Sequence, residues 1–167
     1  HAGGVVHCDI KPSNIGFTKQ GVVKLLDFGL ARVMREARAI TAETGETHDD
    51  VTKSASHRAG GWVGTPAYMS PEAANGDSPK PSFDLWALAV VLYECIAGSR
   101  PFEGRDAFEI LARITTGPAP DIREAQPDVS ETIASFLDSA LNRDLKRRPS
   151  DAAAFDAALR RLRDRVA

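Results

Sequence analysis

The sequence has few of the features that mark disulfide-rich, nucleic-acid-binding or membrane-spanning proteins. Its 167 residues include only two cysteines, Cys8 and Cys95, which lie far apart and form no CxxC pair. Neither a disulfide framework nor a structural zinc site is therefore indicated, and a reducing compartment fits. The 21 basic side chains are balanced by 23 acidic ones. The resulting net charge of -2 provides no attraction for nucleic acid or an anionic membrane.

Long hydrophobic runs are also absent. The longest, from Leu85 to Tyr93, is about half of the length that a bilayer requires. The chain begins at His1 rather than Met and has no signal-peptide pattern, so we interpret it as part of a longer polypeptide. We expect a cytoplasmic segment with neither nucleic acid nor membrane as a partner, which leaves open a membrane anchor elsewhere in the longer protein.

What is present is the composition of one folded domain. Hydrophobic residues make up 43% of the chain and charged residues 26%, which is typical of globular proteins. Apolar periodicity predicts four helices, at residues 82–97, 106–115, 130–142 and 150–166. Because apolar residues point all round the first helix, we expect it to be the buried central one, capped by Ser82 and ended by Gly98. The last helix has an apolar face and arginines that we assign to solvent.

A β-hairpin is predicted near the amino end. Two short apolar runs, 15–18 and 22–26, flank a turn that ends in Gly21. With a two-residue turn, Asn14 faces Asp27 across the ladder, where opposed Cβ atoms are about 5 Å apart. Amide and carboxylate oxygens at that distance suit Mg²⁺. A three-residue turn would shift this pairing, and Asn and Asp are also common simply as residues that end strands.

The loop before the hairpin carries groups suited to phosphoryl transfer. The segment HCDIKPSN, residues 7–14, places Asp9, Lys11 and Asn14 on one proline-stiffened loop. A carboxylate that accepts a hydroxyl proton, a cation near a phosphate and an amide ligand for magnesium are the parts that this reaction needs. With DFG at residues 27–29, the loop resembles the catalytic loop and magnesium motif of eukaryotic-type (Hanks-type) Ser/Thr protein kinases. Three further matches follow in family order, namely GTPAYMSPE at 64–72, DLW at 84–86 and RPS at 148–150.

The resemblance implies a fold that is mostly α with a small β-hairpin. It covers the whole chain, 1–167, as a partial kinase domain of bacterial type. The implied parts are a catalytic loop at 7–14, an activation segment at 27–72 and a helical subdomain at 82–167. We interpret the chain as the carboxyl-terminal lobe (α+β) with the amino-terminal lobe absent, because no glycine-rich loop or VAIK-type lysine precedes His1. We expect the isolated chain to be inactive.

The resemblance also assigns roles to single residues. Those assigned to catalysis are Asp9, Lys11 and Thr65. Those assigned to the cofactors ATP and Mg²⁺ are Lys11, Ser13, Asn14 and Asp27, of which Asn14 and Asp27 would ligate the metal. Asp9 would orient the acceptor hydroxyl, Lys11 would contact the γ-phosphate, and Thr65 would brace Asp9 and Lys11.

Further residues are implied to support this machinery. Glu72 and Arg148 would form a buried ion pair. Asp84 would accept backbone hydrogen bonds from the loop around His7, although a carboxylate at a helix N-terminus is an equal interpretation without the family context. His7 and Phe28 would be packing residues.

The implied activity is transfer of the ATP γ-phosphate to Ser or Thr hydroxyls of a protein substrate. Lys11, two places after Asp9 and followed by Pro12, is similar to Ser/Thr rather than tyrosine kinases. The alternative is a non-catalytic binding module, either a pseudokinase-like scaffold or a remnant.

Two positions depart from the family pattern. Cys8 replaces an arginine that usually pairs with a phosphorylated residue of the activation segment. We therefore expect phosphorylation between Thr41 and Ser56, within a stretch at 34–61 that we interpret as a long mobile loop, to affect activity less than in arginine-bearing relatives. The acidic and histidine residues of that stretch lack regular metal-ligand spacing. Gly16 stands where relatives place a larger apolar residue beneath the adenine ring, which leaves the nucleotide affinity open.

Overall fold

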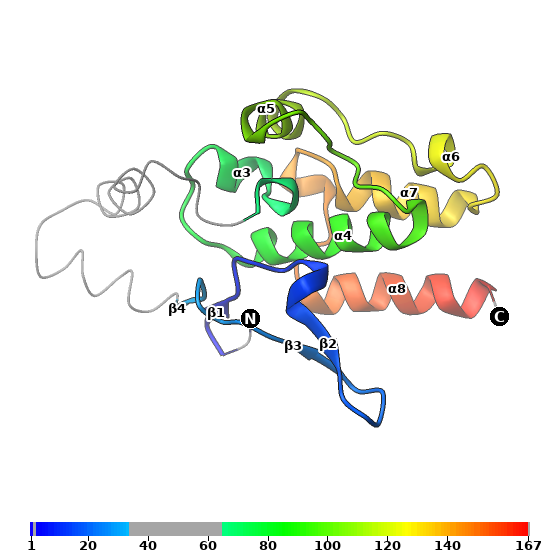
Figure 1. Ribbon diagram of the computed structural model, residues 1–167. Helices are drawn as coiled ribbons and strands as arrows, with labels where there is room; N and C mark the ends of the chain where they lie inside the picture. The colour runs from blue at the N-terminus through cyan, green and yellow to red at the C-terminus, as the bar shows by residue number, and fades with distance from the viewer. Residues whose placement is uncertain (2, 34–64, 167) are drawn as a thin grey trace, which may run out of the picture.

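The computed structural model describes residues 1, 3–33 and 65–166. Figure 1 shows a helical body on which two small antiparallel sheets sit at the amino-terminal side. The expectations for the 34–61 stretch, including its hydroxyl and acidic residues, lie outside the described residues. In the part of the chain that is described, no helix is both long and apolar enough to cross a membrane.

Helix α4, Pro81–Ala97, is the centre of the helical body. Trp86, Ala89 and Val90 on it are each 0% exposed, which confirms the predicted buried central helix. Gly98 ends α4 in the left-handed conformation (φ 75°), as expected of a C-terminal glycine. The prediction that Ser82 caps α4 was wrong. Helix α4 begins one residue earlier because Pro81, whose φ is already helical, occupies its first turn.

The described residues form five further helices. They are α3 (Pro71–Ala74), α5 (Ala107–Thr116), α6 (Ile122–Ala125), α7 (Glu131–Ala140) and α8 (Ala152–Val166). Of these, α6, α7 and α8 contact α4 directly, and α3 and α5 contact each other. Asp106 and Ser130 accept backbone hydrogen bonds at the first turns of α5 and α7, which explains why these helices begin where they do. The apolar face of α8 packs on the core through Phe155, which is 2% exposed.

The predicted hairpin is present, but its register differs from the expected one. Strand β2, Ile15–Phe17, pairs with β3, Val23–Leu25, so that Gly16 faces Lys24 and Phe17 faces Val23. The expected two-residue turn was wrong. Gly21 adopts a positive φ of 78°, which allows a three-residue turn and moves every pair by one position. Asn14 therefore faces Leu26 rather than Asp27, and its carbonyl accepts from the Leu26 N–H at 2.8 Å.

The remaining short elements connect the loops to the body. Strand β1 (Val5–Val6) pairs with β4 (Arg32–Val33), so the chain after the hairpin returns beside the start of residues 7–14. Residues 1, 3–33 and 65–166 also contain three 3₁₀ turns, namely η1 (Pro12–Asn14), η2 (Pro66–Tyr68) and η3 (Leu145–Arg147). The Tyr68 hydroxyl donates to Glu94 at 2.6 Å and fastens η2 to α4.

A buried ion pair joins distant parts of the helical body. Both Nη atoms of Arg148 donate to the Glu72 carboxylate, at 2.9 and 3.0 Å, and both residues are 8% exposed. The Arg148 guanidinium also lies 4.6 Å from the centre of the Trp86 ring. This confirms the expected Glu72–Arg148 pair and shows that it rests on the central helix.

We predict that Glu72→Gln destabilises the protein, because it leaves the Arg148 charge buried without a carboxylate. The cost should be about 3 to 5 kcal/mol, measured by urea unfolding. Asp156→Asn, which breaks the exposed Arg160–Asp156 pair on α8, is the matched control and should leave the unfolding midpoint nearly unchanged. Equal midpoints for the two variants would contradict the stated role of the buried pair.

The same pair predicts a pH dependence. Burial by itself raises the pKa of Glu72, but the hydrogen bonds and charge of Arg148 outweigh it and hold the pKa below its ordinary value of 4.5. Because the folded-state pKa is lowered, this stabilisation is complete above about pH 4.5 and is lost as the pH falls through the folded-state value. Urea unfolding at a series of acidic pH values should therefore show a steeper loss in the wild type than in Glu72→Gln. Parallel curves would argue against the assignment.

Candidate functional site

The loop at residues 7–14 is held by one buried carboxylate. Asp84, in the first turn of α4 and 5% exposed, accepts the backbone N–H of His7 at 2.8 Å and of Cys8 at 2.9 Å. The ring Nε2 of His1 lies 2.9 Å from the same carboxylate. Burial raises the pKa of Asp84, and the two N–H donors oppose that rise because they favour the ionised form. The expected support of the loop by Asp84 is confirmed.

Cys8 adopts a backbone conformation that is uncommon for a residue with a side chain. Its φ is 64°, in the left-handed region. Its N–H group and that of His7 each donate to one of the two oxygens of the Asp84 carboxylate. The bonds to Asp84 offset the strain of the left-handed residue.

His7 carries the connection from Asp84 to the hairpin. It is 3% exposed, and its Nδ1 accepts from the Asp9 N–H at 3.3 Å, so its Nε2 is the atom that donates to the Leu26 carbonyl at 3.0 Å. Its ring also meets the Phe28 ring edge to face, with centres 4.7 Å apart. His7 is thus more than the packing residue that we expected, because it contacts both neighbours of Asp27.

Asp9 is the centre of a compact polar cluster. Lys11 Nζ lies 2.8 Å from Asp9 Oδ2, and Asn14 Nδ2 donates to the same oxygen at 3.0 Å and to the Asp9 carbonyl at 2.9 Å. Lys11 also donates to the Thr65 hydroxyl at 3.2 Å. The structure therefore brings together four of the residues singled out in the sequence, with Thr65 reaching Asp9 through Lys11 rather than directly.

Asn14 and Asp27, the two residues expected to hold a metal, each keep one side-chain oxygen that accepts no hydrogen bond from the described part of the chain. Asn14 is 7% exposed and donates its Nδ2 to Asp9, which leaves its Oδ1 available as an acceptor. Asp27 is exposed with φ 58°, and its Oδ1 accepts from the Gly29 N–H at 3.1 Å, which leaves Oδ2. Gly29 permits this turn, since a Cβ there would lie 3.0 Å from Asp27 Oδ1. Two protein oxygens, completed by water and phosphate, are a usual way to hold Mg²⁺.

Other candidates contribute less. Ser13 lies in η1 with an exposed side chain, next to Asn14. Among the described residues, no group of three or more His, Cys, Asp or Glu side chains is arranged to hold a metal ion. The acidic and histidine residues between Glu46 and His57 lie outside the described part of the chain.

Comparison with known proteins gives a consistent assignment. A family model described as the protein kinase domain matches residues 1–159. The chain is 34% identical over 155 residues to the DNA damage-responsive serine/threonine-protein kinase RqkA of Deinococcus radiodurans, covering 93% of this chain and 21% of that protein. It is 35% identical over 165 residues to the serine/threonine-protein kinase pkn3 of Myxococcus xanthus, covering 95% of this chain and 28% of that protein.

The fold comparison agrees. The solved structure of the Cydia pomonella granulovirus kinase PK-1 matches with a TM-score of 0.65 and 25% sequence identity, covering 92% of this chain and 49% of that chain. The chain thus spans about half of this solved kinase and between 21% and 28% of the two bacterial relatives. Because the family model and the relatives cover nearly the whole chain, it belongs to the protein kinase domain family.

Proposed function

We propose that this chain is the carboxyl-terminal lobe of a Ser/Thr protein kinase that, when complete, transfers the γ-phosphate of ATP to a protein hydroxyl. The observation that carries the proposal is the Asp9 cluster, in which one carboxylate is held by a cation, Lys11, and by an amide, Asn14. Phosphoryl transfer needs little covalent chemistry from the protein and depends on positioning and on neutralising charge.

Each residue of the cluster has a distinct task in this proposal. The Asp9 carboxylate orients the acceptor hydroxyl and takes up its proton. Lys11 lies between Asp9 and Thr65, where its ammonium group neutralises charge on the transferred phosphate. Asn14 Oδ1 and Asp27 Oδ2 would hold Mg²⁺, which when bound neutralises the nucleotide phosphates, and the exposed Ser13 would contact those phosphates.

The lobe assignment is supported by exposed apolar side chains at the hairpin. Phe17 is 72% exposed, Val23 59% and Phe28 56%. Phe17 and Val23 face each other across the hairpin, and neighbouring apolar side chains at this level of exposure mark a surface that another part of a protein covers. The share of the solved kinase that the chain spans, 49%, fits one of two lobes.

Lys11 and Thr65 support the choice of a Ser or Thr hydroxyl as the acceptor. Their contact at 3.2 Å joins the loop at 7–14 to the segment before η2, as the Ser/Thr type of sequence leads us to expect. The acceptor in this proposal is a Ser or Thr hydroxyl, and the segment acts in the cytoplasm without a nucleic acid partner.

A non-catalytic binding module is the second candidate, favoured by the same exposed hairpin. The upstream coding sequence distinguishes the two. A glycine-rich phosphate loop and a VAIK-type lysine in frame identify an enzyme, whereas a start codon close to His1 identifies the module.

We predict that Asp9→Asn in the complete protein lowers phosphorylation of a generic basic protein by about 10² to 10⁴-fold, the usual contribution of a positioned proton acceptor. The measurement is the transfer of labelled phosphate from ATP to that protein. The thermal unfolding midpoint should stay close to that of the wild type, because Asn retains an acceptor for Asn14 Nδ2. Undiminished transfer by this variant would remove Asp9 from its role.

We also predict that Asn14→Ala raises the Mg²⁺ concentration required for half-maximal activity by about ten-fold or more, because it deletes one oxygen ligand. Asp77→Asn, which breaks an exposed pair with Lys80 outside the cluster, is the control and should leave the Mg²⁺ requirement unchanged. A loss of activity in Asn14→Ala that is independent of Mg²⁺ concentration would show that Asn14 only supports Asp9.

A further inference from the structure

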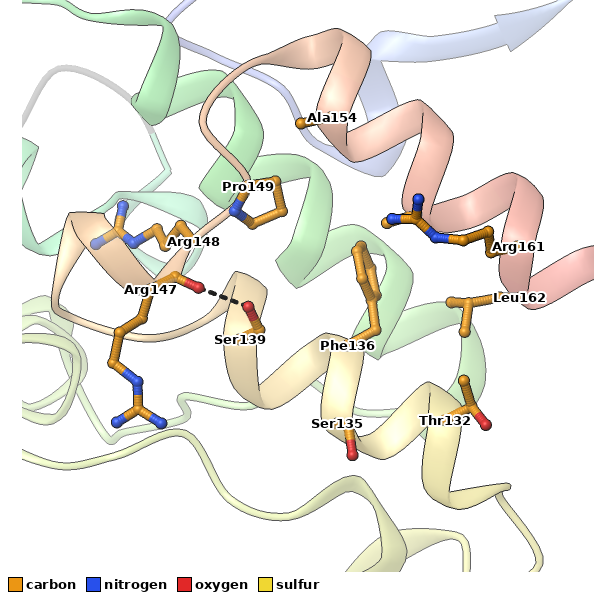
Figure 2. A pocket seen from close by; sticks show the side chains of 11 residues that line it. Thr132, Ser135, Phe136, Ser139, Arg147, Arg148, Pro149, Ala154, Arg161 and Leu162 are labelled. Carbon is orange, nitrogen blue, oxygen red and sulfur yellow. Dashed lines mark hydrogen bonds between the residues drawn. The ribbon is translucent and has the colours of Figure 1, made fainter.

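A groove of about 450 Å³ lies between α7 and α8, and none of its lining residues belongs to the Asp9 cluster. Figure 2 shows Phe136 and Pro149 between the two helices, with Leu162 of α8 on the same side. Phe136 is only 9% exposed and meets Phe155 edge to face at 5.1 Å, so the apolar floor of the groove is fixed by the core. This volume lies within the range of clefts that bind ligands in proteins.

Arg161 is the arginine of α8 that lines the groove, and its charge is not neutralised by a carboxylate of the described residues. Two arginines of α8 are paired, Arg160 with Asp156 at 2.7 Å and Arg163 with Asp164 at 2.8 Å. Arg161 forms no ion pair with any residue that the structure describes. Figure 2 shows its side chain extending from α8 toward Phe136. A guanidinium in this position is suited to bind a carboxylate through two parallel hydrogen bonds.

Two more cations, Lys146 and Arg147, belong to η3, and of these only Arg147 is a lining residue of the groove. Lys146 and Arg147 have no carboxylate partner within the described part of the chain, although the Arg147 carbonyl accepts from the Ser139 hydroxyl at 2.6 Å. The Arg147 guanidinium points away from the groove in Figure 2, so Arg161 is the cation beside the floor. The groove therefore combines an apolar floor with the guanidinium of Arg161, and no acidic side chain is among the described residues that line it.

We propose that the groove between α7 and α8 binds an acidic peptide segment of a partner protein, which places an apolar side chain on Phe136 and Pro149 and a carboxylate on Arg161. Charge complementarity selects this occupant, because Arg161, which has no ion-pair partner among the described residues, attracts an acidic side chain and repels a basic one. The apolar floor supplies the anchor that a charged peptide alone lacks. This binding is independent of the nucleotide site, and both can be occupied together.

The proposal is tested by fluorescence anisotropy of the 167-residue chain with a labelled peptide in which a leucine–phenylalanine pair is flanked by glutamates. We expect saturable binding that weakens as salt is raised, and no binding of the same peptide with lysines in place of the glutamates. Arg161→Glu should weaken binding by about ten-fold or more. The matched control, Arg160→Glu, makes the same charge change one residue away and should change the affinity by less than about two-fold.

A second variant separates the floor from the charge. Ala154 lines the groove and is half-buried, so Ala154→Phe fills the groove and should weaken binding without altering Arg161. Equal affinity for the glutamate and lysine peptides, or unchanged binding in Arg161→Glu, would overturn the proposal. It would also be overturned if Arg161→Glu abolished self-association in sedimentation velocity, or abolished pelleting with phosphatidylserine vesicles, while no peptide bound. Those results would assign the groove to a second copy or to a lipid surface.

Discussion

The site depends on the bonds between the buried Asp84 carboxylate and the backbone of His7 and Cys8. A charge taken out of water is tolerated only when hydrogen bonds replace its solvent, and here two N–H groups at 2.8 and 2.9 Å do so. Because Asp84 belongs to the buried central helix, its hydrogen bonds hold the loop at residues 7–14 in a fixed position on the core. His7 in turn contacts Leu26 and Phe28, the residues on either side of Asp27, and so helps to position Asp27.

The same helix also supports the Glu72–Arg148 ion pair. Trp86, two residues after Asp84, lies beneath the guanidinium of Arg148, which in turn holds Glu72. Two buried carboxylates, one binding backbone amides and one binding an arginine, thus fasten two distant loops to one helix. Both are satisfied by several hydrogen bonds, which is what makes buried charges tolerable and what gives each loop one position.

The sequence predicts the long helices well because periodicity over many residues is a strong signal, and caps such as Asp106 and Ser130 mark their starts. The sequence does not predict α3 and α6, because each has only four residues and so is too short to show a helical repeat of apolar residues. The hairpin register was wrong by one position because the conformation of Gly21 decides it and no apolar pattern reports that conformation. The Asp9 cluster was predicted from motifs, whereas the link through His7 depends on contacts between distant residues that spacing does not reveal.

The most direct test of this account is hydrogen exchange at the backbone amides of His7 and Cys8 in an Asp84→Asn variant. Replacing the carboxylate removes the charge and one of the two acceptor oxygens. The account predicts that these two amides exchange about ten-fold faster or more than in the wild type, while amides of α7 keep their protection. Unchanged exchange at His7 and Cys8 would contradict the claim that Asp84 positions the loop.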